Sequence, residues 1–268
     1  MIELPDAMPV LHRDFLRQAA PLLEAEADLV GLALGGSGLA GQMDEFSDLD
    51  LIVVTEDAAH AALMVRRPAL AARLGELLTA FTGEHVGEPR LLICLYAGPL
   101  HVDLKFVAES DLAPRVEQPR ILWQRGDRLT RAYSRDGARF PAPDPQWMED
   151  RLWVWAHYCA AKIGRGELFE AIDCLDFIRV QVLGPLLLQA AGRRPSGVRR
   201  IERYLPEAVP ALAGTLARYD AADCVRALEA TVTQYRDLRE GNPPAQRRAA
   251  AEQAACDYVA MIGKRLRA

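Results

Sequence analysis

Residues 29–54 have the sequence LVGLALGGSGLAGQMDEFSDLDLIVV, from which the architecture of the N-terminal half can be predicted. Two short runs of apolar, branched residues, 29–34 and 49–54, predict β-strands on either side of a glycine turn at residues 35–38. Asp48 and Asp50 stand at the start of the second run. Because side chains alternate along a strand, both carboxylates should face the same way, about 7 Å apart at the backbone. Two like charges side by side are costly without a cation, and carboxylate oxygens suit magnesium, so the pair predicts a metal site.

The glycine turn predicts a seat for phosphate groups. Backbone N–H groups at Gly35 and Gly36 can approach an anion closely because no side chain intervenes, and the hydroxyl of Ser37 adds a donor. A short helical stretch should follow the turn, and the N-terminus of such a stretch also favours an anion. A phosphate seat beside a pair of metal-binding carboxylates is what nucleotidyl transfer requires.

A third carboxylate lies in residues 100–107, LHVDLKFV, where polar and apolar residues alternate. This alternation predicts another strand, with Asp103 on its polar face beside His101 and Lys105. Asp103 could bind a second metal ion or accept the proton of an attacking hydroxyl, and the ammonium of Lys105 could meet a phosphate of the nucleotide. Each feature alone has an ordinary explanation, such as a simple turn, a cap or a solvated strand residue. The three together favour an active site.

This set of motifs resembles the nucleotidyltransferase superfamily, which includes DNA polymerase beta and the antibiotic nucleotidyltransferases. The superfamily pattern is a Gly-Ser turn, an Asp-x-Asp about ten residues later and a third carboxylate on a subsequent strand. Here the matching residues are Gly36-Ser37, Asp48-x-Asp50 and Asp103, within residues 29–107. The resemblance implies ATP as co-substrate and two magnesium ions held by the three aspartates.

The C-terminal half has a looser resemblance, over residues 147–210, to the helical domain of aminoglycoside 6-adenylyltransferases. It is carried by Lys162, by the segment RGEL at residues 165–168 and by the segment RRIERYLP at residues 199–206, where the family is rich in lysine instead of arginine. The resemblance implies that Lys162 could contact the triphosphate and that Glu167 could bind a substrate amine or act as general base. Both could equally be ordinary residues at helix ends.

The remaining periodicity completes the expected architecture, a mixed α/β (α+β) nucleotidyltransferase domain followed by a C-terminal α-helical bundle. Further strands are expected at residues 91–96 and 121–124, and helices at residues 10–27, 58–81, 147–163, 167–183 and 220–240 and at the C-terminus. Pro185 should kink or end the helix before it. A proline-rich linker, residues 134–146, separates the two parts. We therefore expect a catalytic domain over residues 1–140 and a helical substrate-binding domain over residues 141–268.

Composition restricts the class of protein. The chain has 268 residues, of which 50% are hydrophobic and 26% charged, and a formal net charge of −5. No apolar run is long enough for a membrane helix and the first residues do not resemble a signal peptide, so a cytoplasmic protein without a membrane partner is expected. No extended basic stripe indicates a nucleic-acid partner. The five cysteines have no metal-binding or redox spacing and are expected to be reduced and mostly buried.

The sequence thus predicts an enzyme, an adenylyltransferase that moves AMP from ATP to a hydroxyl of a small molecule, with an aminoglycoside-type antibiotic as the leading acceptor. One alternative is a nucleotidyltransferase acting on a protein or RNA acceptor. The other is a nucleotide-binding module without turnover, although all three aspartates and the serine are retained. The nucleotide base, the regiochemistry and the oligomeric state have no signature in the sequence.

Overall fold

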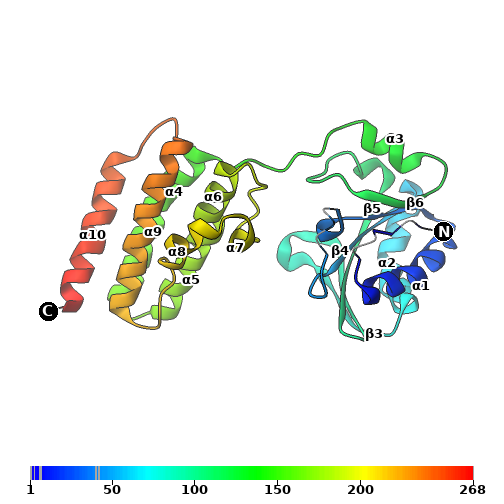
Figure 1. The fold of residues 1–268 in the computed structure, drawn as a ribbon, viewed down its shortest axis with the longest axis horizontal. Helices are drawn as coiled ribbons and strands as arrows, with labels where there is room; N and C mark the ends of the chain where they lie inside the picture. Colours follow the sequence, from blue (N-terminus) through cyan, green and yellow to red (C-terminus); the bar gives the residue numbers. More distant parts are fainter. Residues whose placement is uncertain (1, 3, 6–7, 40, 42, 268) are drawn as a thin grey trace. The chain divides into compact units, whose positions relative to one another are not determined.

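The chain is divided into two compact units, Met1–Arg139 and Phe140–Ala268 (Figure 1). The computed structural model describes residues 2, 4–5, 8–39, 41 and 43–267. The first unit combines a β-sheet with helices, and the described residues of the second unit form helices and connecting segments without strands. The expected fold class, a mixed α/β unit followed by a helical one, is confirmed.

A six-stranded sheet in the order β3-β4-β5-β2-β1-β6 forms the described centre of the first unit. Its strands are β1 (Leu29–Leu34), β2 (Leu49–Thr55), β3 (Leu77–Gly83), β4 (Glu88–Tyr96), β5 (Leu100–Ala108) and β6 (Arg120–Gln124). Strands β2 and β5 pair in parallel, and the other neighbours pair antiparallel. The sheet is therefore mixed, and its one parallel pair joins the two strands that carry the predicted aspartates.

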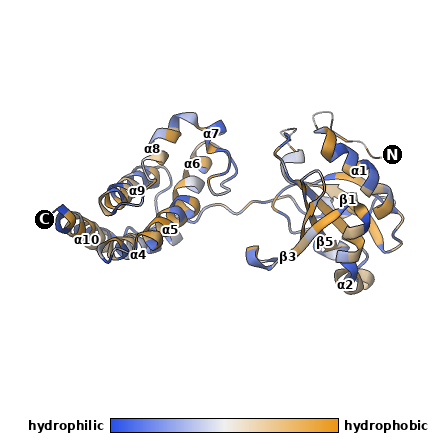
Figure 2. Ribbon diagram, turned by 90° about the horizontal axis from the view of Figure 1, so that it is seen from below, coloured by the Kyte–Doolittle hydropathy of each residue, from blue (hydrophilic) through white to orange (hydrophobic). Residues whose placement is uncertain are grey.

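Helices pack on both faces of this sheet. Helices α1 (Val10–Glu24) and α2 (Asp57–Leu74) cover one face, where Leu16 and Leu63 share a buried cluster with Leu51 of β2. The short helix α3 (Arg128–Ser134) packs on the other face, where Leu129 contacts the cluster that includes Val54. Strands β1 and β5 are correspondingly apolar in Figure 2. Three 3-10 turns, η1 (Gly36–Leu39), η2 (Glu84–Val86) and η3 (Glu109–Asp111), link these elements.

The helix expected over residues 58–81 is wrong in its second part. Helix α2 ends at Leu74, and residues 77–83 form strand β3, which pairs antiparallel with β4 from Leu77↔Tyr96 to Gly83↔Glu88. The segment lies at the edge of the sheet, and its side chains are mostly half-buried or exposed. Its alternation is therefore weak, and pairing with β4, not the local pattern, decides its conformation.

The second unit consists of helices. They are α4 (Pro145–Gly164), α5 (Leu168–Ile178), α6 (Gly184–Ala190), α7 (Ile201–Tyr204), α8 (Val209–Ala213), α9 (Ala221–Gly241) and α10 (Ala249–Arg267), with a 3-10 turn η5 (Pro206–Ala208) before α8. The Asp144 and Asp220 side chains cap α4 and α9, and the Asp220 carboxylate accepts a hydrogen bond from the Asp223 N–H at 2.9 Å. The helix expected over residues 220–240 is confirmed as α9.

Pro185 does not end the helix that precedes it. A π-helical turn, η4 (Arg179–Leu183), follows α5 and leads directly into α6, where Pro185 occupies the first turn. A wider turn accommodates a proline because the missing N–H and the ring no longer conflict with the carbonyl four residues earlier. The chain remains helical through this region.

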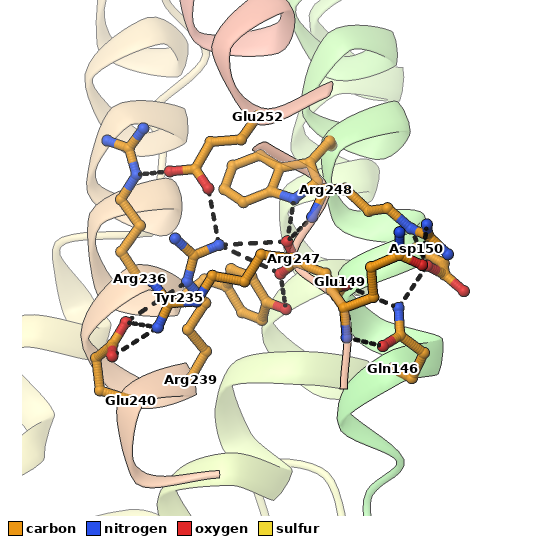
Figure 3. A network of polar contacts seen from close by, with 12 residues as sticks. Gln146, Glu149, Asp150, Tyr235, Arg236, Arg239, Glu240, Arg247, Arg248 and Glu252 are labelled. Atoms are coloured by element: carbon orange, nitrogen blue, oxygen red, sulfur yellow. Dashed lines mark hydrogen bonds and ion pairs between the residues drawn. The ribbon is translucent and has the colours of Figure 1, made fainter. Parts of the chain in front are cut away.

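A buried polar network ties α4, α9 and the start of α10 together (Figure 3). The fully buried Glu149 carboxylate accepts hydrogen bonds from Trp153 Nε1 at 3.1 Å, Tyr235 Oη at 2.7 Å and the Arg248 N–H at 2.9 Å. Arg239 lies 3.2 Å from the same carboxylate and 2.8 Å from Glu252. Burial alone would raise the pKa of Glu149, but these hydrogen bonds and the charge of Arg239 together lower it below the ordinary value.

All five cysteines are free, three of them buried and two half-buried. None of the described helices combines the length with the apolar character that crossing a bilayer requires.

Candidate active site

The parallel pairing of β2 with β5 brings two of the predicted aspartates side by side. In this register Asp50 is the direct partner of Asp103, and Asp48 lies one residue before β2. Each of the three carboxylates offers an oxygen, and these oxygens lie within 4.8 Å of one another. Leu49 and Leu51 alternate with the aspartates and are buried in the sheet core, so the strand period points the carboxylates away from it.

The electrostatics of this cluster fit a divalent cation. All three aspartates are half-buried, which disfavours an accumulation of negative charge. Burial raises the pKa of Asp103, and the negative charge of Asp48 raises it further. His101, whose Nε2 lies 3.0 Å from Asp103 Oδ1, has the opposite effect on this pKa. Hard carboxylate oxygens that converge in this way are the ligands that magnesium prefers. The three residues therefore fit the metal that the sequence implies.

The glycine turn is hydrogen-bonded to β2, the strand that carries Asp50. The Gly35 N–H donates to the Asp50 carbonyl at 2.9 Å, and Gly36 opens the 3-10 turn η1 with a φ of +55°. A Cβ atom at Gly36 would lie 1.7 Å from Asp50 Oδ2. Only glycine combines this left-handed conformation with the space that the Asp50 carboxylate needs. The residue thus shapes the carboxylate cluster as well as the turn.

Ser37 presents an unsatisfied hydroxyl at the same turn. Its Oγ atom is buried and has no hydrogen-bond partner among the described residues. A buried hydroxyl without a partner is costly, so such a group usually awaits a ligand or a water molecule. Its position next to Gly36 fits the expectation that this turn receives a phosphate group.

A cavity of about 450 Å³ opens beside the aspartates, with Asp50 and Asp103 in its wall. Lys105 also lines the cavity, but its ammonium group is 2.7 Å from Glu88 Oε2. Arg90 forms a second ion pair with Glu88, with its Nε atom 2.7 Å from Glu88 Oε1. The hydrogen bond from Arg90, and to a smaller extent that from Lys105, lowers the pKa of Glu88 to about 2. Lys105 is thus held in an ion pair at the side of the site, and its contact with phosphate stays a prediction.

Lys162 and Glu167 lie in the second unit, and the structure brings them together with each other. The Lys162 ammonium lies 2.5 Å from Glu167 Oε2 and 3.6 Å from Glu170 Oε2. Glu167 occupies the N-cap position of α5 without capping it through its side chain. The ion pair links the end of α4 to the start of α5. The expected roles of Lys162 in nucleotide binding and of Glu167 in catalysis stay predictions.

Glu117 is a residue of this site that sequence reasoning missed. Its Oε1 atom accepts a hydrogen bond from the Gly36 N–H at 2.8 Å, across 81 residues of chain. Glu117 lies between η3 and β6, in a segment without helical or strand periodicity. No local pattern could have paired it with the glycine turn.

No family model matches the chain, and no curated protein matches it. Among solved structures, it is similar to an aminoglycoside 6-adenyltransferase from Bacillus subtilis, with 13% identity, coverage of 94% of this chain and 98% of that chain, and a TM-score of 0.41. It is also similar to a nucleotidyltransferase-like protein from Exiguobacterium sibiricum 255-15, with 15% identity, coverage of 85% and 75%, and a TM-score of 0.37.

Proposed function

We propose that this protein is a magnesium-dependent nucleotidyltransferase that moves AMP from ATP to a hydroxyl of a small molecule. One observation carries the proposal: the carboxylate oxygens of Asp48, Asp50 and Asp103 converge to within 4.8 Å beside a glycine turn. The unsatisfied hydroxyl of Ser37 at that turn adds support. A structural role alone does not account for three half-buried carboxylates and an unpaired buried hydroxyl in one place.

In the proposed reaction the acceptor oxygen forms a bond to the α-phosphorus while the bond from that phosphorus to the bridging oxygen breaks. Pyrophosphate leaves with the bonding electron pair, and the proton of the acceptor hydroxyl passes to a base. Magnesium ions held by the three aspartates would supply neutralisation of the phosphate charge. Gly36 and Ser37 would bind the β- and γ-phosphates, and Gly35, whose N–H donates to the Asp50 carbonyl, would leave room for them. Asp103 would help to hold the second metal ion and would accept the proton.

The acceptor is proposed to be an aminoglycoside-type antibiotic. The side chains on one surface of α4 and α5, in the second unit, favour a polyol with amino groups as the acceptor. Trp155 contacts both Trp147 and Phe177, with ring centroids 5.5 and 5.0 Å apart, and the exposed Tyr158 donates to Glu170 at 2.7 Å. Aromatic rings offer stacking faces to the C–H surface of a sugar ring, while carboxylates such as Glu170 attract ammonium groups. Glu167 belongs to the same acidic group through its contact with Lys162.

The proposal is tested by incubating the protein with ATP, magnesium and a panel of aminoglycosides. Mass spectrometry of the small molecules should detect a product heavier by one AMP moiety, together with pyrophosphate. The variant Asp50→Asn serves as the control and should form product at least two to three orders of magnitude more slowly. If no aminoglycoside is modified while pyrophosphate still accumulates, the acceptor assignment is wrong and the nucleotidyltransferase assignment stands.

Two alternatives have their own outcomes. An enzyme that modifies a protein or RNA would transfer radiolabel from α-labelled ATP to macromolecules and not to the antibiotic panel. A nucleotide-binding module without turnover would bind ATP but release no pyrophosphate with any acceptor. Thermal unfolding with ATP, with and without magnesium, separates this last case, because a stabilisation that does not require magnesium indicates simple binding.

A further inference from the structure

Residues 112–119, here called the strap, connect η3 to β6 and line the cavity beside the aspartates. The strap is held at Arg115, whose guanidinium donates to the Tyr133 carbonyl at 2.7 Å, to Gln118 Oε1 at 2.9 Å and to the Ala113 carbonyl at 3.1 Å. The same guanidinium lies 4.9 Å from the centroid of the Tyr133 ring. The strap is therefore tied to α3 at its centre, and this fixes the course of the residues that follow.

Glu117, two residues beyond this anchor, places its carboxylate on the glycine turn. The Gly36 N–H donates to Glu117 Oε1 at 2.8 Å, and a Cβ atom at Gly35 would lie 3.0 Å from the same oxygen. The carboxylate thus uses the close approach that the missing side chains permit. Carboxylate and phosphate oxygens are both anionic acceptors and compete for the same backbone donor.

A polyphosphate at this turn cannot coexist with Glu117 in its present position. The phosphate would need the Gly36 N–H that Glu117 occupies, and it would bring further negative charge next to a carboxylate. Like charges in a half-buried site repel strongly because the local screening is weak. Glu117 already shares the cavity wall with Asp50 and Asp103. Binding of the nucleotide therefore requires that the Glu117 side chain leave the turn.

We propose that Glu117 is a built-in competitor of the nucleotide, an internal carboxylate that occupies the phosphate seat at Gly36 until a polyphosphate displaces it. The inference rests on the proposed function, because it assumes that the glycine turn receives the phosphates of ATP. The apparent affinity for nucleotide equals the intrinsic affinity multiplied by the fraction of molecules in which Glu117 does not occupy the seat. Because the strap also lines the cavity, displacement of Glu117 couples nucleotide binding to a change in the cavity wall.

The test measures binding of an ATP analogue with a methylene group between the α- and β-phosphates, with magnesium, by calorimetry. Glu117→Ala removes the competing carboxylate and should bind the analogue about tenfold more tightly than the unmodified protein. Glu117→Gln keeps the acceptor oxygen but not the charge and should fall between the two. Inorganic tripolyphosphate should show the same order, because the contact concerns phosphate and not the base or ribose.

Asp111→Asn is the matched control. Asp111 lines the same cavity and its replacement removes the same charge, but Asp111 makes no described hydrogen bond to the glycine turn. Its variant should change the affinity less than twofold. An equal effect of both replacements would show that only the general charge of the cavity matters, and this would overturn the inference.

Amide hydrogen exchange gives a readout that does not depend on nucleotide. In Glu117→Ala without ligand, the Gly36 amide should exchange faster than in the unmodified protein, because its hydrogen-bond acceptor is gone. Unchanged or weaker binding of the analogue by Glu117→Ala would overturn the inference and leave the proposed function intact. If neither the unmodified protein nor any variant binds the analogue with magnesium, the proposed function fails, and the inference fails with it.

Discussion

Replacing Gly36 by alanine should disrupt the metal site through a single methyl group. The new Cβ atom would lie 1.7 Å from Asp50 Oδ2, so the carboxylate must retreat by on the order of 1.5 Å to reach an ordinary contact distance. Metal ligands tolerate displacements of only about 0.2 Å. We therefore expect Gly36→Ala to lose Asp50 as a ligand. The loss should weaken binding of a divalent ion about tenfold or more, the effect of removing one charged contact.

The same substitution also carries a backbone cost that must be separated from this effect. Gly36 has a φ of +55°, and a left-handed conformation costs alanine roughly 1–2 kcal/mol of stability. Gly41→Ala is the matched control, since Gly41 has a φ of +60° but a Cβ atom there would meet no described atom within 4 Å. Both variants should lose similar stability to the backbone. Only Gly36→Ala should additionally lose the metal ligand.

The assay is binding of Mn²⁺, as a spectroscopic substitute for Mg²⁺, followed by electron paramagnetic resonance of the free ion. Thermal unfolding in EDTA supplies the backbone cost of each variant. Equal binding of Mn²⁺ by Gly36→Ala and Gly41→Ala would contradict this prediction, because the contact with Asp50 would then have no consequence. If both variants bind Mn²⁺ more weakly, the cause is the backbone conformation of the loop and not the contact with Asp50.

Three further predictions concern the carboxylates. Asp50→Asn should lower turnover by at least two to three orders of magnitude, about 3–4 kcal/mol of barrier, while circular dichroism should detect an intact fold; near-normal activity would exclude the metal site. Asp103→Asn should raise the unfolding midpoint measured in EDTA, because burial and the charge of Asp48 disfavour the ionised carboxylate; a lowered midpoint would show that the contact with His101 dominates. Glu149→Gln should cost about 1.5–3 kcal/mol at pH 7, the value of hydrogen bonds to a charged group. The pKa of Glu149 is lowered from 4.5, so its contribution is present above that pH and is lost as pH falls through the folded-state pKa. Urea unfolding at pH 7 and pH 3 should therefore separate Glu149→Gln from Glu229→Gln, a control at an exposed position of α9, at pH 7 and bring the two closer at pH 3; a difference that grows on acidification would contradict the sign.

The sequence predicted those parts of the fold where local pattern and environment agree. Strands β1, β2 and β5 are short apolar runs bounded by turns; β1 is buried throughout, and burial alternates along the first residues of β2 and β5. Strand β3 was missed because its side chains at the sheet edge are mostly half-buried or exposed, which leaves little period to detect. Pairing with β4 supplies the missing information, and that pairing is a tertiary contact.

In the candidate site, too, the sequence reveals the residues that follow a local pattern and misses those that depend on tertiary contacts. Asp48, Asp50 and Asp103 could be found because metal ligands on strands must occupy one face, and alternation reveals which face. Glu117 could not be found, because its place at Gly36 depends on the anchoring of the strap by Arg115. The ion pair between Lys105 and Glu88 was also missed, since it joins neighbouring strands through a register that the sequence does not reveal.

The convergence of the aspartates is a consequence of the hydrophobic core and not of the aspartates themselves. In the parallel pair, Leu49, Leu51 and Val53 bury on the same face as Val102, Leu104 and Phe106, and their side chains share one cluster. A slip of one residue would turn Asp103 into that cluster and expose its apolar neighbours, which is far more costly than any gain between carboxylates. The register that satisfies the core is therefore the one that sets Asp50 beside Asp103. Because burial of the Leu49 and Val102 face fixes the register, the start of the opposite face can hold charges that repel one another until a cation binds, while Val54 and Val107 farther along that face are buried. One pair of strands can therefore stabilise the centre of the sheet and also hold repelling carboxylates where a cation can bind.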